Sequence, residues 1–258
     1  MPSKKIIEEP EEVSLEDDIG IVETSPNEAA DPADVVERKV PADIRNRYEV
    51  LSYRNAAVVL AETRSAELAE LWDALRHFTI TTGMIRKAGG NESEMPKLFS
   101  ARLRPLAWHE TIISADLEIK LNWREQVGKY DKGRNKGKPR YEPREKVTRR
   151  ERYLDGHKID YVKNRVAFDL EWNSKDQTFD RDLFAFNAFF LSGAIDVGVL
   201  VTRGQSLQTG LAKMGLKKYG ASTTWWGKLV YRLNAGRNGG CPVLALGIKP
   251  ECVSDWPY

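Results

Sequence analysis

Residues 156–173, GHKIDYVKNRVAFDLEWN, decide the fold of this chain. Apolar and polar side chains alternate over residues 166–173, and this period of two predicts a β-strand. One face of the strand carries Phe168, Leu170 and Trp172, and the other face carries Asp169, Glu171 and Asn173. Asn164-Arg165 is read as the two-residue turn of a hairpin, whose first strand is residues 156–163. The sequence therefore predicts a β-hairpin with one polar face.

The turn determines which side chains face each other across this hairpin. Asp160 then lies opposite Asp169 on the polar face, and Lys158 lies opposite Glu171. Directly opposed acids repel each other and destabilise a sheet, and a bound cation offsets that repulsion. Mg²⁺ prefers oxygen ligands, usually one or two carboxylates together with waters and a substrate phosphate. The pattern indicates either a magnesium site for phosphoester cleavage or an ordinary acidic strand face.

The segments around the hairpin predict an α/β fold. Hydrophobic periodicity predicts helices at residues 65–78, 93–104 and 179–192, and strands at residues 112–123, 195–202 and 243–248. A helix that connects two neighbouring strands of one sheet makes those strands parallel. We therefore expect a mixed central sheet flanked by helices.

The net charge of +2 hides a strong polarity along the chain. Residues 1–44 hold thirteen acidic residues, four basic residues and no aromatic residue, which predicts a disordered acidic tail. Residues 45–258 are expected to form a single domain. Within it, residues 129–152 hold eleven basic and four acidic residues and predict a mobile insertion at about 128–153. This insertion is either a solvated charge run or an arm that binds a polyanion.

Composition also argues against several classes of protein. No apolar run approaches 18 residues, so we expect no transmembrane helix, and the first residues lack the apolar core of a secretory signal. Cys241 and Cys252 are too few for a disulfide framework and wrongly spaced for structural zinc, so a cytoplasmic location is expected. Three histidines without an HExxH motif give no support to a zinc hydrolase.

Five segments together resemble the BglII/BstYI family of type II restriction endonucleases, within the PD-(D/E)xK nuclease superfamily. They are residues 159–161, 171–173, 195–204, 219–224 and 242–248. The resemblance covers roughly residues 45–250 and implies a restriction-endonuclease-like core. It implies hydrolysis of phosphodiesters in double-stranded DNA with Mg²⁺, replaceable by Mn²⁺. It also implies a homodimer on a short palindromic site, and a protective DNA methyltransferase as genetic partner.

The resemblance also implies roles for individual residues. The family's first metal-binding acid falls on Asp160 and its second on Glu171. The interval between them is longer than expected, which leaves Asp169 as a rival ligand. The third position, usually glutamine, is Asn173, whose shorter side chain would position the attacking water. A lysine could supply an ammonium group there instead, either Lys158 or Lys175.

Two polar segments are candidate readers of DNA bases, because amide, hydroxyl and cationic side chains recognise base edges. They contribute Lys175, Asp176 and Gln177 in the first segment and Ser222, Thr223 and Thr224 in the second. Ser222 and Thr223 can equally be N-caps of the following helix, and Trp225 and Trp226 fit a core or interface. Two other functions compete with a restriction enzyme. One is a repair or modification-dependent nuclease of the same fold, and the other is a DNA-binding protein without catalytic activity.

Overall fold

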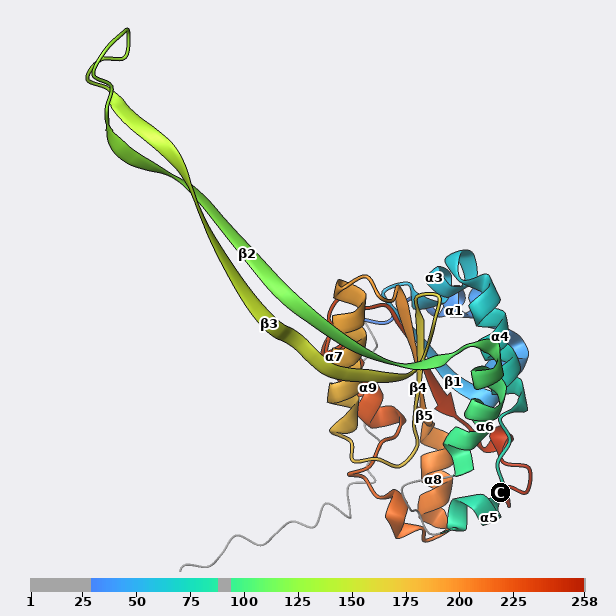
Figure 1. The fold of residues 1–258 in the computed structure, drawn as a ribbon. Coiled ribbons are helices and arrows are strands. Elements are labelled where there is room, and N and C mark those ends of the chain that lie inside the picture. Colours follow the sequence, from blue (N-terminus) through green and yellow to red (C-terminus); the bar gives the residue numbers. More distant parts are fainter. Residues whose placement is uncertain (1–28, 88–93, 258) are drawn as a thin grey trace, which may run out of the picture. The chain divides into compact units, whose positions relative to one another are not determined.

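The chain folds around a mixed β-sheet whose strand order is β1-β6-β5-β4-β3-β2, as seen in the computed structural model (Figure 1). The structure describes residues 29–87 and 94–257. The strands are β1 (Tyr48–Tyr53), β2 (His109–Lys129), β3 (Pro139–Lys163), β4 (Val166–Glu171), β5 (Val197–Arg203) and β6 (Val243–Ile248). β4, β5 and β6 are parallel, whereas β1 is antiparallel to β6 and β3 is antiparallel to β4. The α/β class and the mixed sheet are therefore confirmed.

Helices separate most of these strands along the chain. They are α1 (Ala33–Lys39), α2 (Ala42–Arg47), α3 (Ala56–Thr63), α4 (Ser65–His77), α5 (Thr82–Arg86), α6 (Glu94–Leu103), α7 (Thr178–Leu191), α8 (Gln205–Lys213) and α9 (Trp226–Asn234). Three short 3-10 turns lie at Arg104–Leu106, Lys217–Tyr219 and Pro250–Cys252. Within residues 29–87 and 94–257, the chain forms no helix long and apolar enough to cross a membrane.

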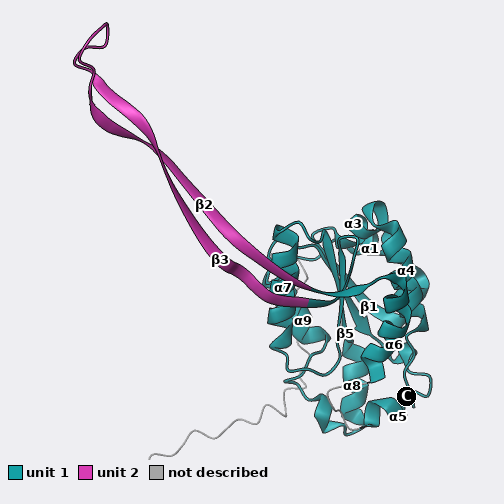
Figure 2. Cartoon of the chain, in the orientation of Figure 1, with its two compact units in different colours: residues 1–111, 159–258 teal, residues 112–158 magenta. Residues whose placement is uncertain are grey.

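The described residues divide into two compact units (Figure 2). Unit 2 is residues 112–158, and unit 1 is formed by the described residues before 112 and after 158. In unit 1, α7 and α9 lie together on one side of the sheet, and α3 and α4 lie on the other (Figure 1). Every residue of β4, β5 and β6 is buried, as expected for strands covered on both faces.

One close approach explains a glycine in this core. A Cβ atom added at Gly198 of β5 would lie 2.4 Å from the Phe186 ring of α7. The missing side chain therefore lets helix α7 pack directly on the sheet next to β4 and β5.

The prediction of a disordered tail at residues 1–44 is wrong for its described end. Residues 1–28 lie outside the described residues, whereas residues 33–39 and 42–47 are helical. Val36, Val40 and Ile44 are buried in the main core cluster. Composition averaged over 44 residues obscured these apolar positions. One of the acids in this segment forms an ion pair with the core, because Asp43 binds Arg76 of α4.

The insertion predicted at about 128–153 is not an irregular loop, because most of these residues are in strands β2 and β3. At the end of the hairpin, the Tyr130 amide donates to the Lys138 carbonyl at 3.0 Å, and the Gly137 amide donates to the Tyr130 carbonyl at 2.8 Å. Over residues 139–153 both faces of β3 carry charged side chains, so the sequence shows no hydrophobic alternation there. Backbone hydrogen bonds between β2 and β3 make this segment a two-stranded hairpin, and amino-acid composition does not predict such pairing.

Replacing Ile44 by alanine tests the corrected N-terminal boundary. Ile44 is fully buried, so the Ile44→Ala variant should lose about 2–5 kcal/mol of unfolding free energy in a urea titration. Ile112 is 63% exposed, and Ile112→Ala is the control, with an expected change within about 0.5 kcal/mol. Equal small losses in both variants would show that α2 does not pack on the core.

Candidate active site

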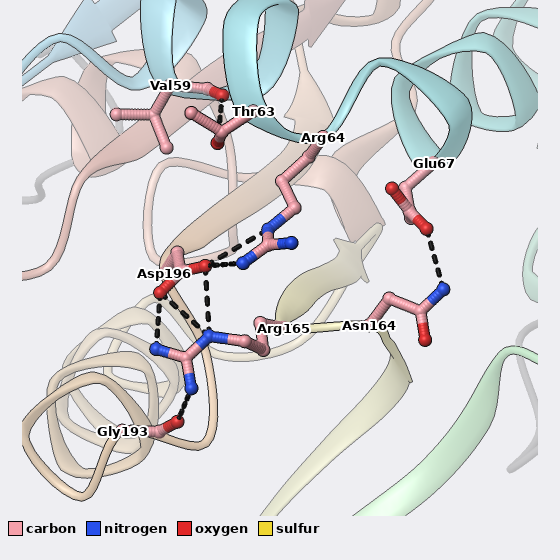
Figure 3. Close-up of polar contacts among 8 residues, drawn as sticks. All are labelled: Val59, Thr63, Arg64, Glu67, Asn164, Arg165, Gly193 and Asp196. Atoms are coloured by element: carbon pink, nitrogen blue, oxygen red, sulfur yellow. Dashed lines mark hydrogen bonds and ion pairs between the residues drawn. The ribbon is translucent and has the colours of Figure 1, made fainter.

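A tight turn of unit 1 fixes the hairpin between β3 and β4. Asn164 and Arg165 both have positive φ, 41° and 69°, as a two-residue hairpin turn requires. This backbone is unfavourable for arginine, and contacts of the Arg165 side chain compensate. Its guanidinium binds the Asp196 carboxylate, with Nε at 2.9 Å from Oδ1, and also donates to the Gly193 carbonyl (Figure 3).

Asp196 connects the turn to a third element. Arg64, directly before α4, donates from Nε to Asp196 Oδ2 at 3.0 Å, so one carboxylate lies between two guanidinium groups (Figure 3). Asn164 adds a second link, because its amide donates to Glu67 of α4 at 2.7 Å. The two arginines hold the pKa of Asp196 below its usual value, Arg165 most strongly. The turn is thus held by charged contacts from α4 and from the start of β5.

The strand register agrees with the register predicted from the turn. Tyr161 pairs with Phe168, Val162 with Ala167 and Lys163 with Val166. Continued by one residue, this register places Asp160 beside Asp169. The charge of Asp160 is one of the causes that raise the pKa of Asp169, after burial itself and the charge of Asp182. Asp160 and Asp169 therefore lie close enough to interact.

Asp169 and Glu171 lie on the face of β4 toward helix α7. A third acid, Asp182, lies beside them and was not predicted from the sequence. Asp182 of α7 is 3% exposed, compared with 5% for Asp169 and 7% for Glu171. Its neighbour Arg181 lies 3.2 Å from Asp182 Oδ1 and 3.8 Å from Glu171 Oε1. The sequence does contain a signal for a buried acid, since Asp182 interrupts the apolar stripe of α7 between Phe179 and Phe186.

Burial raises the pKa of all three carboxyl groups. For Asp169 the shift is large, and Asp182, Asp160 and Glu171 add to it. Burial raises the pKa of Glu171 too, with Arg181 opposing and Asp160 reinforcing that shift. Burial and the charge of Glu171 raise the pKa of Asp182 to about 8. These acids repel one another in a place where water does not screen them.

The donor set suits a hard cation. Glu171 Oε2 and Asp182 Oδ2 are buried and have no hydrogen-bond partner among the described residues. Carboxylate oxygens of this kind are the ligands that Mg²⁺ and Ca²⁺ prefer. No group of three or more His, Cys, Asp or Glu side chains in the described part of the chain is arranged closely enough to hold a metal. Mg²⁺ is commonly held by only one or two carboxylates, with water or substrate completing its shell.

No described contact links Asn173 or Lys175 to these carboxylates. β4 ends at Glu171, so the alternation that placed Asn173 on the acidic face does not continue to it, and Asn173 is exposed in a bend. Lys175 is exposed. Lys158 belongs to unit 2. Arg181, which was not among the predicted residues, lies beside Glu171.

The two predicted base-reading segments, far apart in sequence, lie side by side. Lys175 forms an antiparallel bridge with Thr223. The Asp176 amide donates to the Ser222 carbonyl at 3.0 Å, and the Thr224 amide donates to the Ser174 carbonyl at 2.9 Å. We call residues 174–178 and 217–224 the paired loops. Lys175, Gln177 and Ser222 are exposed on them, whereas Thr224 is buried.

A buried arginine of β5 organises the paired loops. Arg203 donates to the Thr224 carbonyl at 2.6 Å, to Thr223 Oγ1 at 2.5 Å and to Gln208 Oε1 at 2.6 Å. Gln208 in turn donates to the Tyr219 carbonyl at 2.6 Å, and the guanidinium carbon lies 4.8 Å from the centre of the Tyr219 ring. Burial lowers the pKa of Arg203 to about 9, so it remains charged at neutral pH.

Neither Ser222 nor Thr223 caps the following helix. Helix α9 begins at Trp226, with Trp225 at its N-cap position. Thr223 Oγ1 contacts the Gly220 carbonyl and Arg203 instead. Trp225 is 8% exposed and donates to the Ala221 carbonyl at 3.2 Å, which supports its assignment to the core.

The buried acids predict an unusual pH dependence for the metal-free protein. A carboxyl group whose pKa is raised by folding stabilises the native state at low pH, and this stability is lost as the pH rises through the folded pKa. In EDTA, the melting temperature should therefore fall by several degrees between pH 5 and pH 8.

Adding Mg²⁺ or Mn²⁺ at pH 8 should restore most of that loss. Asp182→Asn should flatten the pH slope. Asp43→Asn is the control and should leave the slope unchanged, because the hydrogen bond from Arg76 lowers the pKa of Asp43. A pH-independent melting temperature in the unmodified protein would contradict this electrostatic description.

Substitution of Arg203 tests how the paired loops are held. Arg203→Met removes the donors to Thr224, Thr223 and Gln208 and should cost about 3 kcal/mol of stability. Trypsin should then cut faster after Lys217 or Lys218. Arg237→Met removes a more exposed arginine, paired with Asp180, and should change stability by less than about 1 kcal/mol. Unchanged proteolysis in Arg203→Met would show that the loops are held by other contacts.

Comparison with known proteins agrees with this geometry. The family model described as restriction endonuclease BglII/BglIII matches residues 48–248. The match extends from β1 to β6, so it includes the hairpin of β3 and β4 and both paired loops. No curated protein matches the chain. Since the family model covers most of the sequence, the chain belongs to the BglII/BglIII family of type II restriction endonucleases.

Proposed function

We propose that this protein is a Mg²⁺-dependent type II restriction endonuclease that hydrolyses phosphodiesters of double-stranded DNA at a short palindromic site. The observation that carries the proposal is the hairpin register, which continued by one residue places Asp160 beside Asp169. The register of β3 against β4 and the pKa shifts of Asp169 and Glu171 support it. A restriction endonuclease of this family binds double-stranded DNA and is a hydrolase, and such enzymes generally use a divalent metal ion.

Asp160 and Glu171 are the proposed metal ligands, and Asp169 is the alternative to Glu171. A bound Mg²⁺ would activate a water molecule and neutralise charge on the phosphate that is cleaved. Glu171 is buried on β4 and Asp160 is half-buried on β3, so the ion would be held at the boundary of the core. Arg181 projects from α7 beside Glu171 with 71% of its side chain exposed, so it is available to contact a phosphate oxygen.

Asn173 and the paired loops have separate proposed roles. Asn173 would orient the attacking water through its amide, acting from the exposed segment directly after β4. Five side chains of the paired loops are proposed to contact DNA: Lys175, Asp176, Gln177, Ser222 and Thr223. The predicted contact of Thr224 is not proposed, because Thr224 is fully buried and its hydroxyl accepts from the Ser174 amide. Asp176 also lies 3.5 Å from Arg232, so it helps to hold the loop in place.

Homodimerisation follows from the proposed symmetry of the site. A palindromic sequence presents the same half-site twice, and a two-fold dimer reads both halves with the same residues. A cytoplasmic enzyme of this kind needs a methyltransferase that protects the host's own copies of the site. We propose that such a gene accompanies this one.

Cleavage of unmethylated phage DNA tests the proposal. Discrete fragments should appear with Mg²⁺ or Mn²⁺ and not with EDTA. Asp160→Asn and Glu171→Gln should each lower the cleavage rate at least about 10³-fold, equivalent to about 4 kcal/mol. Both variants should still shift DNA on a gel. Glu37→Gln, on the exposed surface of α1, is the control and should cut normally.

Other outcomes would identify the competing functions. Binding without cutting in the unmodified protein would indicate an inactive DNA-binding protein, and Asn173→Lys would then test whether an ammonium group restores cleavage. Cutting of methylated or damaged DNA alone would indicate a modification-dependent or repair nuclease.

A further inference from the structure

Unit 2 is a separate structural module, and we call residues 112–158 the arm. Figure 2 shows it as a long two-stranded hairpin. Its first strand continues from residue 112 to Lys129, which corresponds to roughly 60 Å of extended chain at the usual rise per residue. One turn of B-DNA is about 34 Å long. The arm is therefore long enough to follow a duplex for more than one helical turn.

The positive charge of the arm is concentrated at its tip. Residues 112–158 contain 14 basic and eight acidic residues, a net charge of +6. The tip, residues 129–140, contains six of those basic residues and a single acid, Asp131, and so carries +5 of that charge. The rest of the arm is almost neutral. The arm is thus a polarised ribbon rather than a uniformly charged one.

Ion pairing divides the arm in the same way. Outside the tip, acids compensate several arginines: Arg144 lies 2.7 Å from Glu125, and Arg149 lies 2.7 Å from Glu118. Five basic side chains of the tip, all exposed, form no ion pair with any residue that the structure describes: Lys129, Lys132, Arg134, Lys136 and Lys138. Uncompensated, exposed cations of this density suit a polyanion.

The backbone of the tip is ordered by hydrogen bonds. Besides the two bonds between Tyr130 and residues 137–138, the Lys136 amide donates to the Gly133 carbonyl at 3.1 Å. Gly133 and Gly137 have φ values of 75° and 82°, which a tight reversal requires and glycine allows. The basic side chains therefore start from a preformed turn, which lowers the entropy that binding would cost.

We propose that the tip of the arm binds the phosphate backbone of double-stranded DNA and adds sequence-independent affinity to that of the paired loops. This inference rests on the proposed function, because that function supplies DNA as the polyanion. The contacts are electrostatic, so they raise the affinity for any DNA sequence and make binding strongly salt-dependent. The carboxylates on β4 take no part in them.

A charge-neutralised tip tests the inference. The variant Lys132→Gln, Arg134→Gln, Lys136→Gln and Lys138→Gln removes four charges that make no ion pair within the described residues. Binding to a fluorescent duplex pool of mixed sequence is measured by anisotropy in EDTA, at several salt concentrations. Affinity at 0.1 M salt should fall by at least about tenfold, and the slope of log K against log salt should decrease by about 3–4.

A second variant with the same charge change is the control. Lys120→Gln, Arg124→Gln, Lys146→Gln and Arg150→Gln removes four exposed charges from the remainder of the arm. Its slope should change by less than half as much. Equal effects of the two variants, or no effect of the tip variant, would overturn the proposal. A loss of self-association in the tip variant without a change in DNA affinity would also overturn it, in favour of a protein interface.

Cleavage separates this proposal from the proposed function. At saturating concentrations of enzyme and DNA, the tip variant should cut phage DNA at the normal rate, whereas Asp160→Asn should not cut. Tip-dependent binding in a protein that never cuts would retain the arm proposal and reject the nuclease. Mg²⁺-dependent cutting together with tip-independent binding would retain the nuclease and reject the arm proposal.

Discussion

The register between β3 and β4 depends on how the Asn164–Arg165 turn is held. Side chains alternate with a period of two, so a slip of one residue would move Asp160 to the opposite face from Asp169. Arg165 is a poor residue for a positive φ, and the ion pair with Asp196 compensates for that backbone. Because Arg64 also binds Asp196, this carboxylate joins the turn to α4 and to the start of β5. Charged contacts at one end of the hairpin thus set the geometry of the acids at the other.

This arrangement places three carboxyl groups that repel one another in the buried core. Asp169 and Glu171 lie on a strand whose residues are all buried, and Asp182 faces them from α7. Replacing such acids by apolar side chains would stabilise the fold, since raised pKa values report a cost of ionisation. Apart from Thr202 and Arg203, the neighbouring strands β5 and β6 contain only apolar residues and glycine. A cation bound beside these acids would offset their mutual repulsion.

The sequence predicted what depends on local periodicity and missed what depends on tertiary contact. Alternation identified β4, and the turn residues gave its register correctly. Asp182 was overlooked because its helix was read only for its apolar stripe. Helices α1 and α2 were overlooked because the average composition was acidic, although Ile44 is fully buried. Residues 128–153 were not predicted as strands because this part of β3 has no apolar face, and its pairing with β2 is visible only in three dimensions.

The proposed recognition loops and the proposed metal ligand Glu171 share one structural support. Two adjacent residues of β5 contact both parts: Thr202 donates to the Glu171 carbonyl at 2.8 Å, and Arg203 donates to the Thr224 carbonyl at 2.6 Å. Ser174, bonded to Thr224, follows Glu171 by three residues. A non-cognate DNA sequence that displaced the loop would therefore also shift residues 172–174, which directly follow the proposed metal ligand Glu171. Buried hydrogen bonds would transmit such a shift, because a close-packed core contains little empty space into which side chains could move instead.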